Sequence, residues 1–575
     1  MNSNIGENIE KISEEFTTHF YNKEKLKDVV TEQTGIMLSQ VFLNKLTKRD
    51  AHISLIENAI IQKKLNQDVK YQEIQESVPY LFEGEVSKNP QKVALIYGDH
   101  EVSYEELNLK SNMLAHYLIN KGVKKEDSIG IFMDRSISMI ISIVAIIKAG
   151  ATYVPIDLNS PLKRIEYIIK DTEMQYIISD SSVYSKIKEV NTPFIFIDKE
   201  WDYISLELTK NLDIGVNKNN LAYINYTSGT TGEPKGVCIE QKSIVRLVKN
   251  NSYIDFNSQE IFFQFAPIAF DAATFEIWGS LLNGATLVIC NKPIPTVEEF
   301  KQIFHNHNVS TLWLTVGLFN LLVDEDVDVF KNIKQLIVGG DKLSIKHISK
   351  LKAAIPNLNV VNGYGPTEST TFAMTYTIKD LKKARKYNSI PIGKPISNTQ
   401  VYILKENFLP CALNEIGEVY IGGDGLCRGY LNSDYLNHEK FVLNPLFEDD
   451  SELLYRTGDL AFIDSDGGDI VFAGRKDNQT KIRGYRIELS EIESQILTHS
   501  SIDNVVVIAK NVRENSEKNL YAYVIIKKGH QISSSEIRQF LQQRLPLYMI
   551  PMSFKFMERF PLTANGKIDY RKLDS

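Results

Sequence analysis

From about Val78 onward, short apolar runs alternate with longer stretches of helical periodicity, and this alternation constrains the possible folds more than any other feature. Val93–Tyr97 is typical of a buried strand, whereas Tyr104–Lys121 and Ile137–Lys148 have the spacing of helices. Alternating strands and helices indicate parallel sheets covered by helices. After about Leu413 the strands become shorter and hairpin-like. The sequence therefore predicts the α/β fold class, with a large N-terminal core of α/β layers plus a β-rich subdomain, followed by a small α+β C-terminal lobe.

The composition is that of an ordinary globular protein, with 43% hydrophobic and 24% charged residues in a chain of 575. A net charge of -7 argues against a protein that binds nucleic acid through its phosphates. The apolar run Ile137–Ile147 is too short for a membrane span, and the first residues lack the regions of a signal peptide. Four scattered cysteines form no CxxC pair and are expected to be reduced thiols. We therefore expect a cytoplasmic protein that binds neither nucleic acid nor membrane.

The segment Tyr226–Gly236 concentrates glycine, hydroxyl residues and one lysine directly after a short apolar strand. Glycine lets backbone N–H groups approach a ligand closely, and hydroxyls with a lysine complete a concave site for polyphosphate. A Walker A loop is excluded because its Lys precedes Ser or Thr, whereas Lys235 is followed by Gly236. A solvent-exposed turn is the simpler alternative, although a turn needs neither this ending nor so many hydroxyls. The candidates for phosphate binding are Thr227, Ser228, Gly229, Thr230, Thr231, Gly232 and Lys235.

This loop resembles the phosphate-binding signature of the adenylate-forming superfamily, which comprises acyl-CoA ligases, luciferases and the adenylation domains of nonribosomal peptide synthetases. Further motifs of that superfamily follow in the same order: Asn362–Glu368, Tyr455–Asp459, Gly474–Gln479 and Asn565–Asp569. Each motif is ordinary alone, but their order along most of the chain makes the resemblance specific. The resemblance implies ATP and Mg²⁺ as cofactors.

By the same resemblance, each motif has a role at the nucleotide. Tyr364 would lie along the adenine face, Thr367 would touch phosphate, and Glu368 would be the Mg²⁺ ligand. Mg²⁺ prefers one or two carboxylates together with phosphate oxygens and water. Asp459 would bind the ribose, and Arg475 the ribose or a phosphate. The other residues implied at the nucleotide are Gly340, Asp341, Asn362 and Gly365. The catalytic residues implied are Thr227, Lys235 and Lys567.

Asp271 places one acid in the apolar segment Phe270–Trp278. A carboxylate in such a setting is costly unless it meets a cation. It could cap the helix that follows, or, as in peptide-synthetase adenylation domains, bind the α-ammonium of an amino acid. Acyl- and aryl-CoA ligases bind no ammonium, so an acid at this position favours an amino-acid substrate over that alternative class. A purely binding or structural role is disfavoured, because it would leave Glu368, Arg475 and Lys567 without a use.

The family's specificity positions describe a mostly apolar substrate pocket. By the resemblance they are Asp271, Ala272, Phe275, Trp313, Ile337, Gly339, Gly363, Thr371, Phe372 and Lys567. Phe275 and Trp313 are expected to narrow the pocket, and Gly339 and Gly363 to leave local room. Such a pocket suits a small branched side chain, and the ordered set resembles the valine-type code of bacterial synthetases. An apolar pocket separates side chains that differ by one methylene by only ~1–3 kcal/mol, so some activation of isoleucine is expected.

Apolar residues at helical spacing predict an N-terminal helical leader or linker over residues 1–77. The resemblance implies an adenylation core over 78–476 and a mobile C-terminal lobe over 477–575 with its hinge at Asp477. The reaction it implies is ATP-dependent activation of L-valine as valyl-AMP with release of pyrophosphate. Transfer to the phosphopantetheine thiol of a peptidyl carrier protein follows. Because no carrier motif follows Lys567, the carrier is expected in a separate protein or downstream of this chain. The short leader suits an initiating module, such as those of aureusimine-like pyrazinone synthetases.

Overall fold

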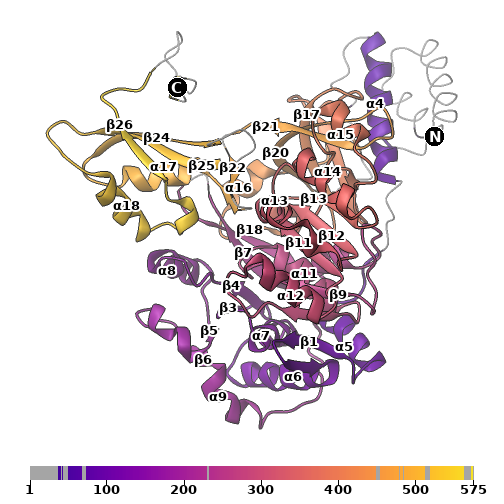
Figure 1. The fold of residues 1–575 in the computed structure, drawn as a ribbon, viewed down its shortest axis with the longest axis vertical. Helices are drawn as coiled ribbons and strands as arrows, with labels where there is room; N and C mark the ends of the chain where they lie inside the picture. Colours follow the sequence, from indigo (N-terminus) through magenta and orange to yellow (C-terminus); the bar gives the residue numbers. More distant parts are fainter. Residues whose placement is uncertain are drawn as a thin grey trace.

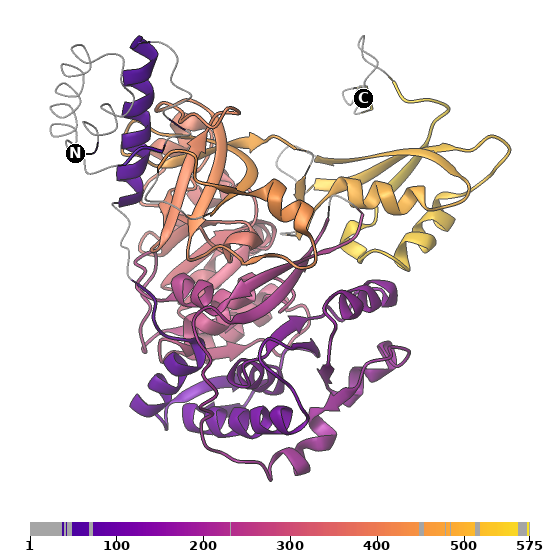
Figure 2. The ribbon, with the colours of Figure 1, turned by 180° about the vertical axis from the view of Figure 1, so that it is seen from behind.

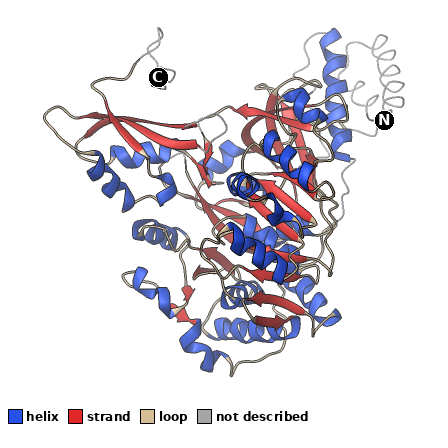
Figure 3. Cartoon of the chain, viewed as in Figure 1, coloured by secondary structure: helices blue, strands red, loops and turns tan. Residues whose placement is uncertain are grey.

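The computed structural model of the chain describes residues 31, 37–39, 42, 49–67, 73–229, 232–447, 453–477, 479–482, 485–511, 518–561 and 572–573. Figure 1 shows a large body of sheets and helices, with a smaller lobe formed by the last strands and helices at one end of it. Helices flank the strands throughout the body (Figure 3). The predicted α/β fold class, with its large core, β-rich subdomain and small C-terminal lobe, is confirmed.

Two mainly parallel sheets form the core. The first has parallel strands in the order β13 (Asn359–Tyr364), β12 (Gln335–Gly339), β11 (Thr311–Thr315), β9 (Ile261–Gln264), β10 (Thr286–Ile289) and β1 (Val93–Tyr97). Its antiparallel edge strands are β14 (Met374–Thr377), β15 (Lys394–Pro395) and β2 (His100–Ser103). The second has the order β18 (Gly429–Tyr430), β8 (Lys235–Glu240), β7 (Leu221–Thr227), β4 (Thr152–Pro155), β3 (Ser128–Phe132), β5 (Tyr176–Ser179) and β6 (Phe194–Phe196). Parallel pairing requires crossover connections, and helices supply most of them.

The helices of the body have these bounds: α5 (Val78–Lys88), α6 (Tyr104–Asn120), α7 (Ile137–Lys148), α8 (Leu162–Asp171), α9 (Ile197–Ile204), α10 (Gln241–Val248), α11 (Ala272–Leu281), α12 (Val297–Asn306), α13 (Val316–Glu325), α14 (Ile345–Ala354), α15 (Lys382–Tyr387) and α16 (Asp434–Lys440). Every residue of α11 is buried, as is α7 from Met139 onward. A helix that is buried on all sides belongs to the interior of a large core. One apolar cluster accordingly joins these two helices to strands of both sheets.

The β-rich subdomain is a third sheet, and the helix α4 (Arg49–Gln67) of the N-terminal segment covers its edge. Its strands are β16 (Thr399–Leu404), β17 (Gly417–Gly423), β20 (Leu453–Ile463) and β19 (Phe441–Leu443), with β21 (Ile470–Arg475) paired to β20. The amide of Gln62 donates to the carbonyl of Ile403 at 3.0 Å and accepts from its N–H at 2.9 Å. Asn66 makes the same pair of bonds with Val401. These amides satisfy the open edge of β16, which would otherwise be free to pair with another strand. The rest of the predicted leader lies largely outside the described residues.

The C-terminal lobe begins with a hairpin of β22 (Thr480–Ile482) and β23 (Tyr485–Ile487). Its main part contains α17 (Leu489–Leu497), β24 (Ile502–Asn511), β25 (Lys518–Ile526), α18 (Ser534–Gln542) and β26 (Ser553–Phe556), around an apolar core of its own. From behind, as from the front, the lobe lies next to α8 of the body (Figure 2). Among the described residues, no helix combines the length and apolar character that crossing a bilayer requires.

Candidate active site

The predicted phosphate loop connects β7 to β8, two antiparallel strands in which Thr227 lies opposite Lys235. Gly229 has no room for a side chain, because a Cβ there would lie 2.0 Å from the carbonyl oxygen of Glu233. The hydroxyl of Thr227 is buried and has no hydrogen-bond partner among the described residues. Such an unpaired group is costly, so it marks a place where a ligand would be favoured. Thr230 and Thr231, also predicted in this loop, lie outside the described residues.

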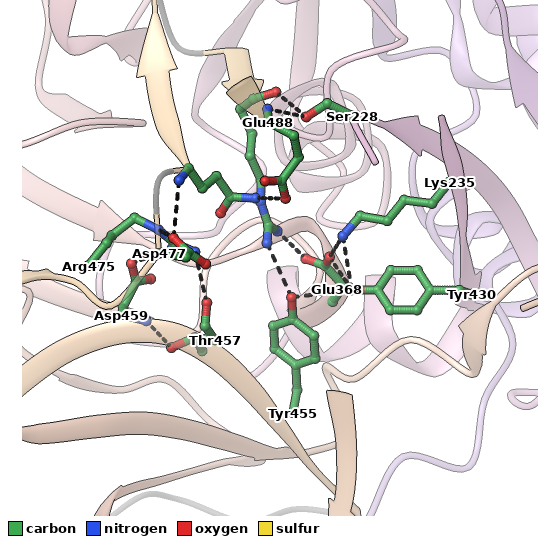
Figure 4. A network of polar contacts seen from close by, with 12 residues as sticks. Ser228, Lys235, Glu368, Tyr430, Tyr455, Thr457, Asp459, Arg475, Asp477 and Glu488 are labelled. Atoms are coloured by element: carbon green, nitrogen blue, oxygen red, sulfur yellow. Dashed lines mark hydrogen bonds and ion pairs between the residues drawn. The ribbon is translucent and has the colours of Figure 1, made fainter. Parts of the chain in front are cut away.

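Glu368 is fully buried beside this loop, where cations and a tyrosine hold its carboxylate. Lys235 and Tyr430 point toward it (Figure 4); the Lys235 Nζ lies 3.4 Å from its Oε1, and the Tyr430 hydroxyl donates to the same oxygen at 2.6 Å. Nη1 of Arg486 donates to Oε2 at 2.6 Å. Burial alone would raise the pKa of Glu368, but Arg486 and Lys235 outweigh burial and hold that pKa well below its usual range. Glu368 is therefore an ionised carboxylate in the interior.

The residues around the loop fit the predicted Mg²⁺. The described part of the chain has no group of three His, Cys, Asp or Glu side chains that could hold a metal alone. A magnesium ion here would therefore depend on one carboxylate together with phosphate oxygens and water, the donor set that Mg²⁺ commonly takes at nucleotide sites. The buried anion Glu368, the unpaired hydroxyl of Thr227 and the buried cation Lys235 supply the protein part of such a site.

The residues predicted to bind adenine and ribose converge on one cavity of about 260 Å³. Motifs from four separate parts of the chain line it: Gly340, Asp341, Asn362, Tyr364, Asp459 and Arg475. Asp459 accepts a hydrogen bond from the Tyr364 hydroxyl, and Nη1 of Arg475 donates to it at 2.5 Å. Arg475 thereby holds in place the carboxylate that is predicted to meet the ribose hydroxyls. The backbone of Gly365 packs so closely on the chain that a Cβ would lie 2.4 Å from the carbonyl oxygen of Thr371.

Asp271 occupies the position before α11, yet its side chain makes no capping hydrogen bond. The carboxylate is half-buried, and burial raises its pKa, an effect opposed by a hydrogen bond from Thr367 and by the charge of Lys481. Among the described contacts, Asp271 therefore does not act as a helix cap through its side chain. The carboxylate is available for a cation.

The predicted pocket residues lie together beside Asp271. Ala272, Phe275, Trp313, Ile337 and Phe372 are all buried, and the rings of Phe275 and Phe372 lie 5.5 Å apart. The structure differs from the expected room beside the two glycines, because the chain itself fills that space. A Cβ on Gly363 would lie 2.7 Å from Cε1 of Phe372, and one on Gly339 would lie 2.5 Å from the carbonyl oxygen of Gly363. Gly363 thus lets the ring of Phe372 approach the chain, and Gly339 lets its strand lie close to the backbone of Gly363, so neither position offers the expected room.

Comparison with models of known protein families identifies the family of this chain. The family model described as AMP-binding enzyme matches residues 82–431, and the one described as AMP-binding enzyme C-terminal domain matches residues 491–567. The chain belongs to the AMP-binding enzyme family. The first match contains the phosphate loop and Glu368, and the second begins at Glu491.

Relatives within this family are large synthases. A linear gramicidin synthase of Brevibacillus parabrevis is 42% identical over 86% of this chain, and tyrocidine synthase 3 of the same organism is 39% identical over 86%. The chain spans only 6% and 8% of the lengths of these two relatives. A solved structure of holo-PA1221, described as an NRPS protein containing adenylation and PCP domains bound to a vinylsulfonamide inhibitor, is 30% identical. It matches with a TM-score of 0.78 over 87% of this chain and 84% of that one. The predictions of an adenylation domain and of an AMP-forming amino-acid ligase are confirmed at this level.

Other predictions concern the lobe of this AMP-binding enzyme. Asp477, the predicted hinge, accepts hydrogen bonds of 2.7 Å from Nε and Nη2 of Arg475 (Figure 4). Lys567 lies outside the described residues. Sequence reasoning misses Lys481 and Lys518, two lobe residues that line the cavity at which adenine and ribose are predicted to bind, called the nucleoside cavity below.

Arg486 and Glu491 are likewise absent from the predicted site, although both contact it. The signal available for them is the concentration of charge among apolar residues in the segment from Lys481 to Glu491. Charges of that kind are seldom buried unless they are paired.

Proposed function

We propose that this AMP-binding enzyme activates L-valine with ATP and then transfers the valyl group to a carrier thiol. The observation that carries the proposal is the uncapped carboxylate of Asp271 at the edge of a buried apolar pocket. A carboxylate that caps no helix suits the α-ammonium of an amino acid, and the closely spaced rings of Phe275 and Phe372 suit a small branched side chain. The ring of Phe372 fills the space beside Gly363, which supports a small side chain such as that of valine.

The proposed chemistry has two steps. In the first, an oxygen of the valine carboxylate attacks the α-phosphorus of ATP, and pyrophosphate leaves. Lys235 contributes positive charge at the phosphate loop, and Lys567 is proposed to contribute it at the α-phosphate. When bound, Mg²⁺ neutralises phosphate charge, and Glu368 would hold it. In the second step a thiol attacks the acyl carbon of valyl-AMP, and AMP leaves.

A phosphopantetheine-bearing peptidyl carrier protein is the proposed acceptor of the valyl group. Its support is the similarity to PA1221 and to an artificially fused NpsA-ThdA protein of Klebsiella oxytoca. Both are described as containing an adenylation and a PCP domain, and the second is 28% identical with a TM-score of 0.77 over 84% of this chain and 94% of that one.

The four cysteines are free and buried, which suits a reducing compartment such as the cytoplasm.

An amino-acid-dependent ATP–pyrophosphate exchange panel tests the substrate. Valine is expected to give the strongest exchange, isoleucine a weaker signal, and aromatic or acidic amino acids almost none, because one methylene in an apolar pocket is worth ~1–3 kcal/mol. The alternative class, an acyl- or aryl-CoA ligase, predicts exchange with a carboxylic acid that lacks an amino group. A panel led by phenylalanine or by a fatty acid would contradict the proposal.

A further inference from the structure

The C-terminal lobe binds a backbone N–H group of the core that the proposed reaction needs for binding phosphate. Glu491, on α17, is only 1% exposed, and its Oε2 accepts a hydrogen bond from the backbone N–H of Gly229 at 3.0 Å. Its Oε1 lies 3.0 Å from Nη1 of Arg164, on α8 of the core. A carboxylate of the lobe thus takes the loop amide that would otherwise face a phosphate oxygen.

At the predicted metal ligand Glu368, the lobe contributes a cation rather than an anion. Arg486, on β23, donates to Oε2 of Glu368 at 2.6 Å, while Lys235 and Tyr430 engage Oε1. Both oxygens of Glu368 therefore have partners, and one of these partners comes from the lobe. A magnesium ion and the Arg486 guanidinium would compete for the same carboxylate oxygen.

Further hydrogen bonds hold the lobe against the loop. The hydroxyl of Ser228 donates to the carbonyl of Arg486 at 2.8 Å and accepts from the N–H of Glu488 at 3.1 Å, as Figure 4 shows for Ser228 and Glu488. The side-chain amide of Gln495 donates to the carbonyl of Gly232 at 3.1 Å. Every described glycine or serine of the loop interior therefore contacts the lobe in this structure.

We propose that Glu491 and Arg486 together substitute for magnesium pyrophosphate, so that the docked lobe and magnesium pyrophosphate exclude each other. The acid takes the place of a phosphate oxygen at Gly229, and the base takes the place of the metal at Glu368. This inference rests on the proposed function, which supplies the assignment of the loop to phosphate and of Glu368 to Mg²⁺. Linkage is reciprocal, so docking weakens magnesium pyrophosphate binding by the factor by which magnesium pyrophosphate weakens docking. The lobe then docks only after pyrophosphate has left, and its docking opposes the reverse of adenylate formation.

Lobe position can be followed by fluorescence energy transfer between two exposed sites. Tyr203 on the core is 68% exposed and Met552 on the lobe is 60% exposed, whereas the four native cysteines are buried. Dyes attached to a Tyr203→Cys/Met552→Cys protein therefore label the two bodies selectively. Inorganic pyrophosphate with Mg²⁺ should change the transfer efficiency in a saturable way. An unchanged efficiency at saturating magnesium pyrophosphate, with binding verified by calorimetry, would overturn the proposal, and so would the absence of binding.

Calorimetric titration of variants with magnesium pyrophosphate tests the two residues. Glu491→Gln keeps the size of the side chain but removes its charge, and it should tighten binding at least tenfold. Arg486→Gln should do the same, because Glu368 is then free for the metal. Gln495→Ala is the matched control: it removes one docking hydrogen bond and no charge, so through the same linkage binding should tighten by a few-fold, less than in either charge variant. If Glu491→Gln bound magnesium pyrophosphate within threefold of the parent protein, Glu491 could not be taking the place of a phosphate oxygen.

These outcomes are separable from those of the valine panel. If no amino acid supports exchange but magnesium pyrophosphate still displaces the lobe, the proposed function fails and the competition stands. If valine supports exchange while the lobe does not respond, only the competition fails. Should a variant not fold by circular dichroism, the energy-transfer titration of the parent sequence still decides the proposal.

Discussion

The hydroxyl of Thr371 donates a hydrogen bond of 2.8 Å to the backbone carbonyl of Asp271. This bond joins the start of α11 to the loop that carries Phe372, so the predicted ammonium partner and the aromatic wall are held together. Thr370 and Thr371 have φ values of +53° and +64°, a conformation that is unusual for β-branched residues. Backbone strain of this kind is maintained by its surroundings and is concentrated at functional sites.

Removing the charge of Asp271 should abolish amino-acid activation. The α-ammonium would enter a desolvated pocket without its counter-charge, a loss of ~3–5 kcal/mol or roughly 10²- to 5 × 10³-fold in exchange rate. We expect this for Asp271→Ala and also for Asp271→Asn, which could still cap a helix. Circular dichroism should show both variants folded. Undiminished valine exchange in Asp271→Asn would mean that the charge has no role.

Gly363→Ala should shrink the valine pocket. The new Cβ would lie 2.7 Å from Cε1 of Phe372 and would push that ring toward Phe275. We expect kcat/KM for valine to fall about tenfold or more, which corresponds to ~1.4 kcal/mol. Adding Phe372→Leu to this variant should restore part of the lost kcat/KM. Unchanged kinetics in Gly363→Ala alone would show that the Phe372 ring can move away without narrowing the pocket.

Arg246 is expected to act as a positioning residue for the loop that carries Phe372. Its guanidinium is buried, which lowers its pKa to about 10, and it donates to the carbonyls of Phe372 at 2.6 Å and Ser369 at 3.3 Å. Arg246→Met would leave those carbonyls unpaired, at ~1–3 kcal/mol each. We expect the KM for valine to rise at least tenfold while kcat changes less. Arg246→Lys should recover part of the loss, and a pure loss of kcat would contradict a positioning role.

The parts of this structure that follow from sequence are those with a local signal. The continuous apolar run of Val93–Tyr97 predicts β1 at its observed bounds, and the run Ile137–Lys148 predicts α7, because strand and helix periods are properties of short segments. The nucleotide motifs also meet in one cavity as expected. Arg486 and Glu491 could not be placed in this way, because they act across an interface between two bodies. The filled space at Gly363 is likewise a tertiary packing fact that no neighbouring residue encodes.

The pair of Glu126 and Arg428 should make stability depend on pH in acid. Two hydrogen bonds of 2.8 and 2.9 Å from Arg428 lower the pKa of Glu126 to about 2, against 4.5 for the ordinary group. A depressed carboxylate pKa stabilises the fold above pH 4.5, and this contribution is lost as the pH falls toward 2. Because the pair is partly exposed, we expect only ~1–2 kcal/mol at pH 7.

Calorimetric melting temperatures of Glu126→Gln should therefore be lower than those of the parent by about 1–3 °C at pH 7. The difference should narrow as the pH falls from 5 toward 3. Glu106→Gln is the matched control, because its ion pair with Lys110 is an i,i+4 contact on one helix, and such pairs contribute little. A difference that stays constant with pH would rule out the ion pair as its source.

Lys567→Ala should separate the two proposed half-reactions. In this structure the face of the lobe that meets the core carries Lys481, at the nucleoside cavity, and Arg486, at Glu368. The resemblance implies that Lys567 acts at the α-phosphate in the first step, whereas the second step needs a thiol to enter from outside, so we expect the lobe to move between the two steps. A rotation at Asp477 would provide that movement, since a few residues at an element boundary commonly absorb such a change.

We therefore expect Lys567→Ala to slow valyl-AMP formation by roughly 10²-fold or more, in line with the loss of one preorganised charge contact. Thiol loading from pre-made valyl-AMP should be nearly unaffected. Lys555→Ala, which removes an exposed lysine of β26 in the same lobe, should leave both steps intact. Asp477→Pro, which fixes φ near -65°, should show the reverse pattern or impair the two steps unequally. Single-turnover kinetics with a carrier protein measure each step. Equal losses in both steps for Lys567→Ala would mean that one lobe position serves both, because a residue needed in only one arrangement cannot slow the chemistry of the other.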